Sequence, residues 1–389
     1  FLASNDKVTQ TKMKIAPRLV AWQRKYGRHG LPWQHTRDPY RVWLSEIMLQ
    51  QTQVTAVIDY YHRFLTQFPD VRALAQASTD QVMAQWAGLG YYARARNLHA
   101  CAKQVISVWH GKFPPDAAGL ITLPGIGPST AAAIAAFCYG ERAAILDGNV
   151  KRVLARLFAL EGDPTSRPVE LQLWSRAREL VPTARACAQD PGVMSAYTQG
   201  LMDLGATVCT RSRPKCEACP LKKDCLAHLQ GRCDELPWPR ARKVLPERST
   251  AMLVAHQAGQ VLLTKRPTAG IWGGLWSLPE CDPQLAPTTA CKQLGLTVKT
   301  VDTLAEFLHV FTHYRLIIRP HLVQIAPGGA THVSATQGLV GGGEWVPIHR
   351  LHECGLPAPV RKLLDGLTAA RLIGERSSTG ALDPKAETH

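Results

Sequence analysis

The pattern of apolar and polar positions changes character along the chain. From about residue 15 to residue 229, apolar side chains recur at spacings of three and four, as in Val54, Val57, Tyr61, Phe64 and Phe68. This is the periodicity of amphipathic helices that bury one face. Segments typical of strands are scarce in this part. The pattern therefore predicts an all-α region.

The second part of the chain follows a stretch rich in proline and charge, RCDELPWPRARKVLPER at residues 232–248, which indicates a linker. Short apolar runs at 251–255 and 261–264, and an extended segment at 315–325, then indicate strands. We predict a multi-domain protein with an all-α domain over 1–231, a linker over 232–248, an α+β domain over 249–366 and a disordered tail over 367–389.

Composition and charge narrow the classes of protein. With 46% hydrophobic and 19% charged residues in 389, the chain is typical of a folded protein. No apolar run approaches the roughly 18 residues that span a bilayer, so no membrane partner is expected. The first residues lack the apolar core of a signal peptide, which predicts a cytoplasmic location. The formal charge of +15 favours a polyanionic partner, although a basic surface can also serve only solubility.

Four of the eleven cysteines are grouped within a short segment. Cys209, Cys216, Cys219 and Cys225 have the spacing C-x6-C-x2-C-x5-C, and four thiolates so close in sequence can surround one metal centre. Zinc sites more typically present two C-x2-C pairs, and this segment has one. The spacing therefore favours a [4Fe–4S] cluster, with zinc as the alternative.

Two features suit contacts with the phosphates of a nucleic acid. Arg211, Arg213 and Lys215 lie between the first two grouped cysteines, so a metal would fix a cationic loop that contacts DNA. Gly125 and Gly127 lie in LPGIGPST at 123–130, where a tight turn before a helix can expose backbone N–H groups. An ordinary turn between two helices would have the same sequence.

Two acidic residues differ in their expected surroundings. Glu46 is the only acid in the apolar stretch VWLSEIML, so burial would raise its pKa and keep it partly protonated, as a general acid requires. Asp147 precedes an apolar periodic run, where backbone donors at a helix start would stabilise its charge. An exposed or ion-paired Glu46 and a plain N-cap at Asp147 are the alternatives. Together the two carboxyls suit cleavage of a glycosidic bond.

The hairpin at 123–130, Asp147 and the cysteine group together resemble the helix-hairpin-helix superfamily of base-excision DNA glycosylases. Within it, the chain looks like the MutY family of adenine DNA glycosylases. The segments that carry this likeness are LPWQ (31–34), VWLSEIMLQQTQV (42–54), LGYYARARNL (89–98), LPGIGPSTAAAI (123–134), ILDGNVKRVLAR (145–156) and MDLGATVC (202–209).

The resemblance implies a role for several residues. Glu46 would protonate the leaving adenine, and Asp147, assisted by Asn149, would stabilise or capture the sugar cation. Reaching the base requires flipping it out of the duplex. Leu31, Trp33, Gln34 and Gln199 match family positions around the extruded base, and Gln51 and Tyr91 match residues that wedge into the helix. Leu31 and Trp33 would also fit an ordinary core.

Ser129 bears on whether the chain only removes a base or also nicks the DNA strand. Relatives that also nick DNA carry a lysine at this position, and a serine cannot form the Schiff base that β-elimination needs. The resemblance therefore implies a monofunctional glycosylase, although some MutY relatives have tyrosine here.

The second domain resembles the Nudix-like domain that reads 8-oxoguanine in this family, with GIWGGLWSLPE at 270–280 as the clearest marker. A hydrolytic Nudix helix needs carboxylates for Mg²⁺, and the corresponding stretch TTACKQLGL has none, which implies a binding module. Phe311, Thr312 and His313 occupy the place where many relatives contact the lesion with Phe-Ser-His.

The expected substrate is double-stranded DNA with adenine opposite 8-oxoguanine, or opposite guanine, bound by a monomeric, nucleoid-associated, bacterial-type enzyme. Two alternatives remain. One is a glycosylase that also acts as a lyase on oxidised pyrimidines, disfavoured by Ser129 and the second domain. The other is a lesion-binding protein that has lost catalysis, disfavoured by the presence of Glu46 and Asp147.

Overall fold

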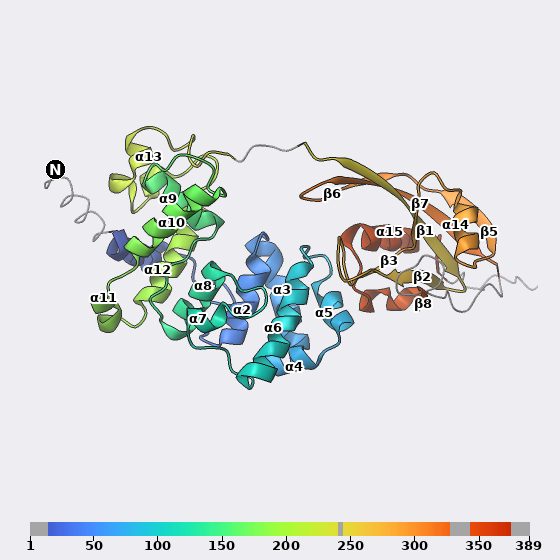
Figure 1. The fold of residues 1–389 in the computed structure, drawn as a ribbon, viewed down its shortest axis with the longest axis horizontal. Helices are drawn as coiled ribbons and strands as arrows, with labels where there is room; N and C mark the ends of the chain where they lie inside the picture. The colour runs from blue at the N-terminus through green and yellow to red at the C-terminus, as the bar shows by residue number, and fades with distance from the viewer. Residues whose placement is uncertain (1–14, 240–243, 327–342, 375–389) are drawn as a thin grey trace, which may run out of the picture. The chain divides into compact units, whose positions relative to one another are not determined.

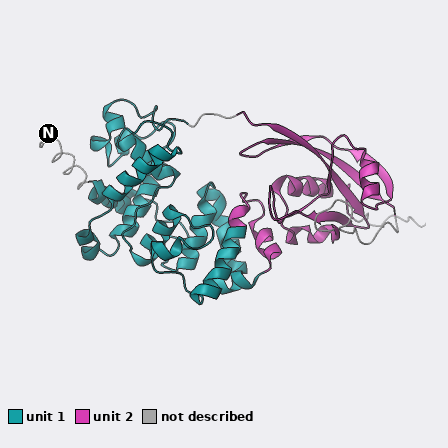
Figure 2. Cartoon of the chain, in the orientation of Figure 1, with its two compact units in different colours: residues 1–77, 96–242 teal, residues 78–95, 243–389 magenta. Residues whose placement is uncertain are grey.

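The computed structural model describes residues 15–239, 244–326 and 343–374. These residues form two compact units (Figures 1 and 2). The helical unit comprises residues 15–77 and 96–239, and the sheet unit comprises residues 78–95, 244–326 and 343–374. None of the described helices is both long and apolar enough to cross a membrane.

The helical unit confirms the all-α prediction. After the helical residues 15–26, its α-helices are α2 (Pro39–Leu49), α3 (Val54–Gln67), α4 (Val71–Gln76), α6 (Ala93–Trp109, whose first residues belong to the sheet unit), α7 (Ala117–Leu120), α8 (Pro128–Tyr139), α9 (Gly148–Leu157), α10 (Arg167–Leu180), α11 (Ala184–Gln189), α12 (Val193–Asp203) and α13 (Leu226–Leu229). A π-helical turn, η1 (Leu204–Val208), and two 3₁₀ turns, η2 (Cys216–Ala218) and η3 (Lys222–Asp224), surround the grouped cysteines.

Polar capping residues fix where these helices begin, and their apolar faces fix what they pack against. Asp38 and Asp147 each accept a hydrogen bond from a backbone N–H of the first turn, of α2 and α9 respectively, which satisfies a donor that the helix itself leaves free. The apolar face of α9, with Val150 and Leu154, packs into a core that also holds Tyr197 of α12. This packing fixes α9, and with it Asp147, against the centre of the unit.

The turn between α7 and α8 is the predicted hairpin. Gly125 has a φ of 77°, and a Cβ on it would lie 2.7 Å from the Cβ of Asn97, so glycine is needed both for conformation and for space. Gly127 is the N-cap of α8, with a φ of −89° and open space where a Cβ would lie. The turn itself therefore requires only the first glycine, while the second leaves the backbone open to approach.

The sheet unit is built on a mixed sheet and confirms the second predicted fold. Its strands are β1 (Glu247–Gln257), β2 (Gln260–Lys265), β3 (Trp276–Ser277), β4 (Glu280–Cys281), β5 (Val298–Thr303), β6 (Phe307–Val310), β7 (Arg315–Ile325) and β8 (Gly343–Pro347). The order β3-β2-β1-β7-β5 forms the main path, with β4 on β1, β6 on β7 and β8 on β2. Only the β1–β7 pair is parallel among the described strands.

Helices complete the sheet unit (Figure 1). α14 (Pro287–Gln293), which belongs to the stretch expected to correspond to the hydrolytic Nudix helix, has no acidic residue, and its Cys291 packs with Leu253 of β1 in one core. Met252 and Val254, which alternate with that core face along β1, are buried as well, so both faces of the strand are covered. The remaining helical elements are η4 (Ile348–Glu353) and α15 (Ala358–Ala369).

The compact units divide the chain differently from the expected domains in two places. Residues 78–95, including α5 (Thr79–Trp86), group with the sheet unit, where the Tyr92 hydroxyl donates to the carbonyl of Leu356. Residues 232–239, expected to be linker, group with the helical unit. α15 runs past residue 366, and residues 375–389 of the expected tail lie outside the described residues.

Candidate active site

A cavity of about 550 Å³ opens in the helical unit. It lies between the segment around residues 23–37, α2 and α12. Five of the residues predicted for the site line it: Leu31, Trp33, Gln34, Glu46 and Gln199. The fold thus brings together a carboxyl, two amides and two apolar side chains from distant parts of the sequence.

Glu46 lies on α2 among side chains that are otherwise buried, including Ser45 and Ile47 on either side. Burial raises the pKa of Glu46 from 4.5 to about 8, and the negative charge of Asp147 raises it further in the same direction. The predicted environment of Glu46 is therefore present. The coupling between the two groups also shows that the fold places the carboxyls close enough to interact.

Asp147 is the N-cap of α9, and its Oδ1 accepts a hydrogen bond of 2.7 Å from the backbone N–H of Val150. The sequence suggested that such donors would govern this group. Burial acts in the opposite direction and is the larger cause, so the pKa of Asp147 is raised, while the backbone donors and the positive charges of Arg152 and Lys151 oppose the rise. The carboxyl is held in a drier place than a plain N-cap.

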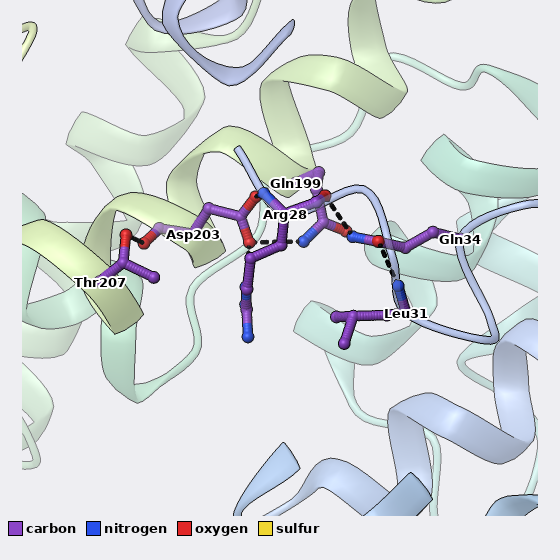
Figure 3. Close-up of polar contacts among 6 residues, drawn as sticks. All are labelled: Arg28, Leu31, Gln34, Gln199, Asp203 and Thr207. Carbon is purple, nitrogen blue, oxygen red and sulfur yellow. Dashed lines mark hydrogen bonds and ion pairs between the residues drawn. The ribbon is translucent and has the colours of Figure 1, made fainter. Parts of the chain in front are cut away.

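A buried carboxylate holds the wall of the cavity together (Figure 3). Asp203, which is fully buried, accepts hydrogen bonds from the backbone N–H of Arg28 at 2.9 Å, from Arg28 Nε at 2.7 Å and from Gln199 Nε2 at 2.8 Å. Gln34 closes the loop, because its Oε1 accepts from the N–H of Leu31 and its Nε2 donates to the carbonyl of Arg28.

The residues at the centre of this network were missed at the sequence level. Asp203 lies in the segment MDLGATVC, and its backbone carbonyl also accepts a hydrogen bond of 2.8 Å from Thr207 Oγ1. Its acidic side chain in an apolar helical run is the same signal that singled out Glu46 and could have identified it. Arg28 carries no comparable signal, because its partner is distant in sequence.

The structure also describes the other predicted residues of the helical unit, and none of them is part of the cavity lining. Ser129 lies at the start of α8, and its Oγ accepts a hydrogen bond of 2.9 Å from the N–H of Leu146, which anchors the segment just before Asp147. Gln51 is exposed and has a φ of 58°, a conformation that non-glycine residues seldom adopt.

Trp33 lines the cavity, and it also packs edge-on against Tyr61, with 5.3 Å between the ring centroids.

Tyr91 belongs to the sheet unit and shares the unusual backbone of Gln51. Its φ is 50° and its side chain is 44% exposed, with the guanidinium of Arg94 lying 5.5 Å from the centre of its ring. An exposed aromatic side chain held in a strained conformation is a feature that functional sites retain at a cost in stability.

The four grouped cysteines line a second, small cavity of about 30 Å³ in the helical unit. Arg156, His228 and Cys233 are among the six further residues that share this lining and lie outside the motif. Arg156 is buried, and its guanidinium donates to the carbonyls of Thr210 and Leu236 and lies 3.4 Å from the sulfur of Cys209. A cation thus faces the place where thiolates would gather.

α9 connects the cysteine-containing loop to the segment that carries Asp147. Arg152 of α9 donates to Asn149 Oδ1 at 2.9 Å, to the carbonyl of Gly205 at 2.7 Å and to the carbonyl of Cys209 at 2.7 Å. Asn149 also packs closely on Gly205, since a Cβ added to Gly205 would lie 2.6 Å from the Cβ of Asn149. A loop fixed at Cys209 therefore holds the start of α9, where Asp147 lies.

The expected phosphate-binding loop is exposed. The side chains of Arg211, Arg213 and Lys215 are all exposed, and none of them forms an ion pair with another described residue. Three cations without an acidic partner form a surface that attracts anions.

In the sheet unit, the predicted lesion contacts lie at the turn between β6 and β7. Phe311 packs against Trp272 and Tyr314, with ring centroids 5.3 and 4.8 Å away. Thr312 and His313 are exposed beside this aromatic cluster, and Thr312 Oγ1 lies 3.4 Å from His313 Nδ1. The turn thus presents polar groups on a rigid aromatic base.

Comparison with known proteins identifies both units. Residues 44–179 match the model of the HhH-GPD superfamily of base excision DNA repair proteins, and residues 250–366 match the NUDIX domain model. The adenine DNA glycosylase of Buchnera aphidicola subsp. Acyrthosiphon pisum is 32% identical over 355 residues, which cover 91% of this chain and 98% of that protein. The chain belongs to the adenine DNA glycosylase family.

Other members and relatives agree with this family assignment. The adenine DNA glycosylase of Homo sapiens is 33% identical over 408 residues, covering 89% of this chain and 72% of that protein. The solved structure of a thermostable thymine-DNA glycosylase superposes with a TM-score of 0.50 at 27% identity, covering 57% of this chain and 99% of that one. The chain is thus a base-excision DNA glycosylase, a hydrolase of N-glycosyl bonds, and its family is of the iron–sulfur-bearing type.

Proposed function

We propose that this chain removes adenine from duplex DNA where it is paired with 8-oxoguanine, and also where it is paired with guanine. The observation that carries the proposal is Glu46, an acid with a pKa of about 8 in the wall of a cavity and coupled to Asp147. The curated relatives are adenine DNA glycosylases, which supports adenine as the base.

The two carboxyls divide the chemistry between them. Glu46 is protonated near neutrality and donates its proton to the departing adenine, so that the base leaves neutral. Positive charge then develops on the sugar, and Asp147 stabilises it as the carboxylate, since an opposite charge nearby lowers the pKa that burial has raised. Asn149, held by Arg152, assists at the same end of α9.

The cavity wall selects and orients the base. The adenine has to leave the stack, and Leu31 and Trp33 offer apolar surface while Gln34 and Gln199 offer amides to its polar edge. Gln51 and Tyr91, both exposed and both in a left-handed conformation, are the residues that we assign to wedging into the duplex. In this proposal their backbone strain keeps each side chain projecting from its turn.

The glycosylase is proposed to be monofunctional. Ser129 stands where lyases of the superfamily carry lysine, and its hydroxyl is engaged with the N–H of Leu146. A hydroxyl cannot form the Schiff base that precedes β-elimination. Base removal should therefore leave an intact abasic strand.

We propose that Cys209, Cys216, Cys219 and Cys225 hold a [4Fe–4S] cluster. A single tetrahedral zinc, with Zn–S bonds of about 2.3 Å, would draw the four sulfurs to about 3.8 Å from one another. Among the residues that the structure describes, no three of these four sulfurs all lie within 4.8 Å of one another, so their spread suits a larger centre. When bound, the cluster would act as a structural centre that fixes the loop of Arg211, Arg213 and Lys215.

The remaining parts of the proposal concern the DNA. The cationic loop and the backbone around Gly125 and Gly127 would bind phosphates without reading sequence, while Phe311, Thr312 and His313 would read the 8-oxoguanine. The enzyme is further proposed to act as a monomer, on the nucleoid DNA of a bacterial-type cell.

The test is single-turnover cleavage of three matched duplexes, with adenine opposite 8-oxoguanine, guanine or thymine, each analysed with and without alkali. Strand breaks that appear only after alkali, fastest for the 8-oxoguanine duplex, are the expected result. Breaks without alkali would indicate a lyase, and binding without base release would indicate a lesion-binding protein. Either result would contradict the proposal.

A further inference from the structure

A fifth thiol lies beside the four grouped cysteines. Cys233 Sγ is 3.8 Å from Cys216 Sγ, and both side chains line the small cavity. His228 joins them, since its ring nitrogen and the two sulfurs all lie within 4.8 Å of one another. Cys233 lies outside the C-x6-C-x2-C-x5-C motif, in a segment whose composition predicted a linker.

The backbone around Cys233 is held in place. Arg232 forms ion pairs with Glu161, at 2.7 Å, and with Glu235, at 2.6 Å. On the other side, the carbonyl of Leu236 accepts a hydrogen bond of 2.8 Å from the buried Arg156. The thiol of Cys233 is therefore a fixed feature of the cavity and does not depend on a freely moving linker.

Two sulfurs at 3.8 Å are in van der Waals contact, so either can reach the same point through rotation of its side chain. Thiolates are the ligands that iron–sulfur clusters take. We propose that Cys233 is an alternate cluster ligand, able to occupy the coordination position of Cys216. The inference rests on the proposed [4Fe–4S] cluster and concerns one of its four corners.

The test compares iron and acid-labile sulfide per chain in purified wild type, Cys216→Ala, Cys219→Ala and the double variant Cys216→Ala/Cys233→Ala. Cys216→Ala should retain about half or more of the wild-type cluster, whereas the double variant should lose nearly all of it. Cys219→Ala is the matched control, because among the described residues Cys219 makes no sulfur contact with Cys233. It should lose the cluster by itself. Cys187→Ala, half-buried on α11, controls for loss of any thiol.

Two results would overturn the inference. Cys216→Ala could lose the cluster or aggregate as fully as Cys219→Ala, or the double variant could retain as much iron as the single one, which would assign the corner to another group such as His228. A second measurement is alkylation of the folded proteins with iodoacetamide. Cys233 should be labelled less in Cys216→Ala than in wild type, and equal labelling would contradict the exchange.

The design separates this inference from the proposal beneath it. If wild-type protein holds no iron and sulfide, or holds zinc, the proposed cluster itself is wrong. If wild type holds the cluster and Cys216→Ala loses it as fully as Cys219→Ala, the cluster stands and the role of Cys233 falls.

Discussion

Replacing the proposed general acid should make the protein more stable, and increasingly so as the pH rises. The folded state raises the pKa of Glu46 from 4.5 to about 8, chiefly because the carboxyl is buried. Between these values the folded chain keeps a proton that the unfolded chain has released. Stability then falls as the pH rises, because the unfolded state binds fewer protons. Glu46→Gln removes this group from the balance.

The magnitude follows from the size of the shift. When the folded state binds one proton more than the unfolded state, the free energy of unfolding falls by about 1.4 kcal/mol per pH unit. The contribution of Glu46 to the free energy of unfolding should therefore fall by about 3 kcal/mol between about pH 5 and about pH 7.5. Gln and protonated Glu are similar in size and polarity, so near pH 5, half a unit above the unfolded pKa of 4.5, Glu46→Gln should be the more stable by only about 1 kcal/mol. Near pH 7.5 Glu46→Gln should be the more stable by about 4 kcal/mol.

The assay is urea unfolding followed by far-ultraviolet circular dichroism, which reports mainly on the helical unit, at a series of pH values. Asp59→Asn, an exposed acid on the neighbouring α3, is the control and should change the free energy of unfolding by under about 0.5 kcal/mol throughout. A difference between Glu46→Gln and wild type that stays constant with pH would refute the raised pKa. So would a wild type that gains stability relative to the variant as the pH rises.

Three further predictions concern residues around the site. Asp147→Asn keeps an acceptor for the N–H of Val150, so stability should change by less than about 1 kcal/mol while single-turnover cleavage slows at least about a hundred-fold; a loss of stability with unchanged rate would reduce Asp147 to a cap. Asp203→Asn should cost about 3 kcal/mol in urea unfolding and weaken duplex binding, because Arg28 loses its buried partner; unchanged binding would exclude a positioning role. Ser129→Ala should cost about 1 kcal/mol, measured in the same way, and should still give no strand breaks without alkali.

The fold and part of the site could be predicted from the sequence because their signals are local. Helical periodicity, strand-like runs and the cysteine spacing each lie within a short segment, and the structure places helices, strands and a cysteine-lined cavity at those positions. Glu46 was identifiable for the same reason, since a single acid in the apolar stretch VWLSEIML is a local signal, while its burial is decided only by the packed unit.

What the sequence could not supply depends on contacts between distant residues. Arg28 and Asp203 meet only after folding, and so do Arg156 and the loop after Cys209. The raised pKa of Asp147 was missed because burial is a property of the packed unit, while the cap that opposes it is visible in the sequence. Cys233 was assigned to a linker by its composition, which says nothing of the ion pairs that fix its neighbour Arg232.

The central claim, that Glu46 is the acid that releases adenine, is tested most directly by single-turnover cleavage of a duplex with adenine opposite 8-oxoguanine by Glu46→Gln. Asp59→Asn serves as the control. The variant should still bind the duplex but release base at least about a thousand-fold more slowly than wild type, whose own rate should fall as the pH rises through about 8. A Glu46→Gln enzyme that cleaves within about ten-fold of the wild-type rate would contradict the account.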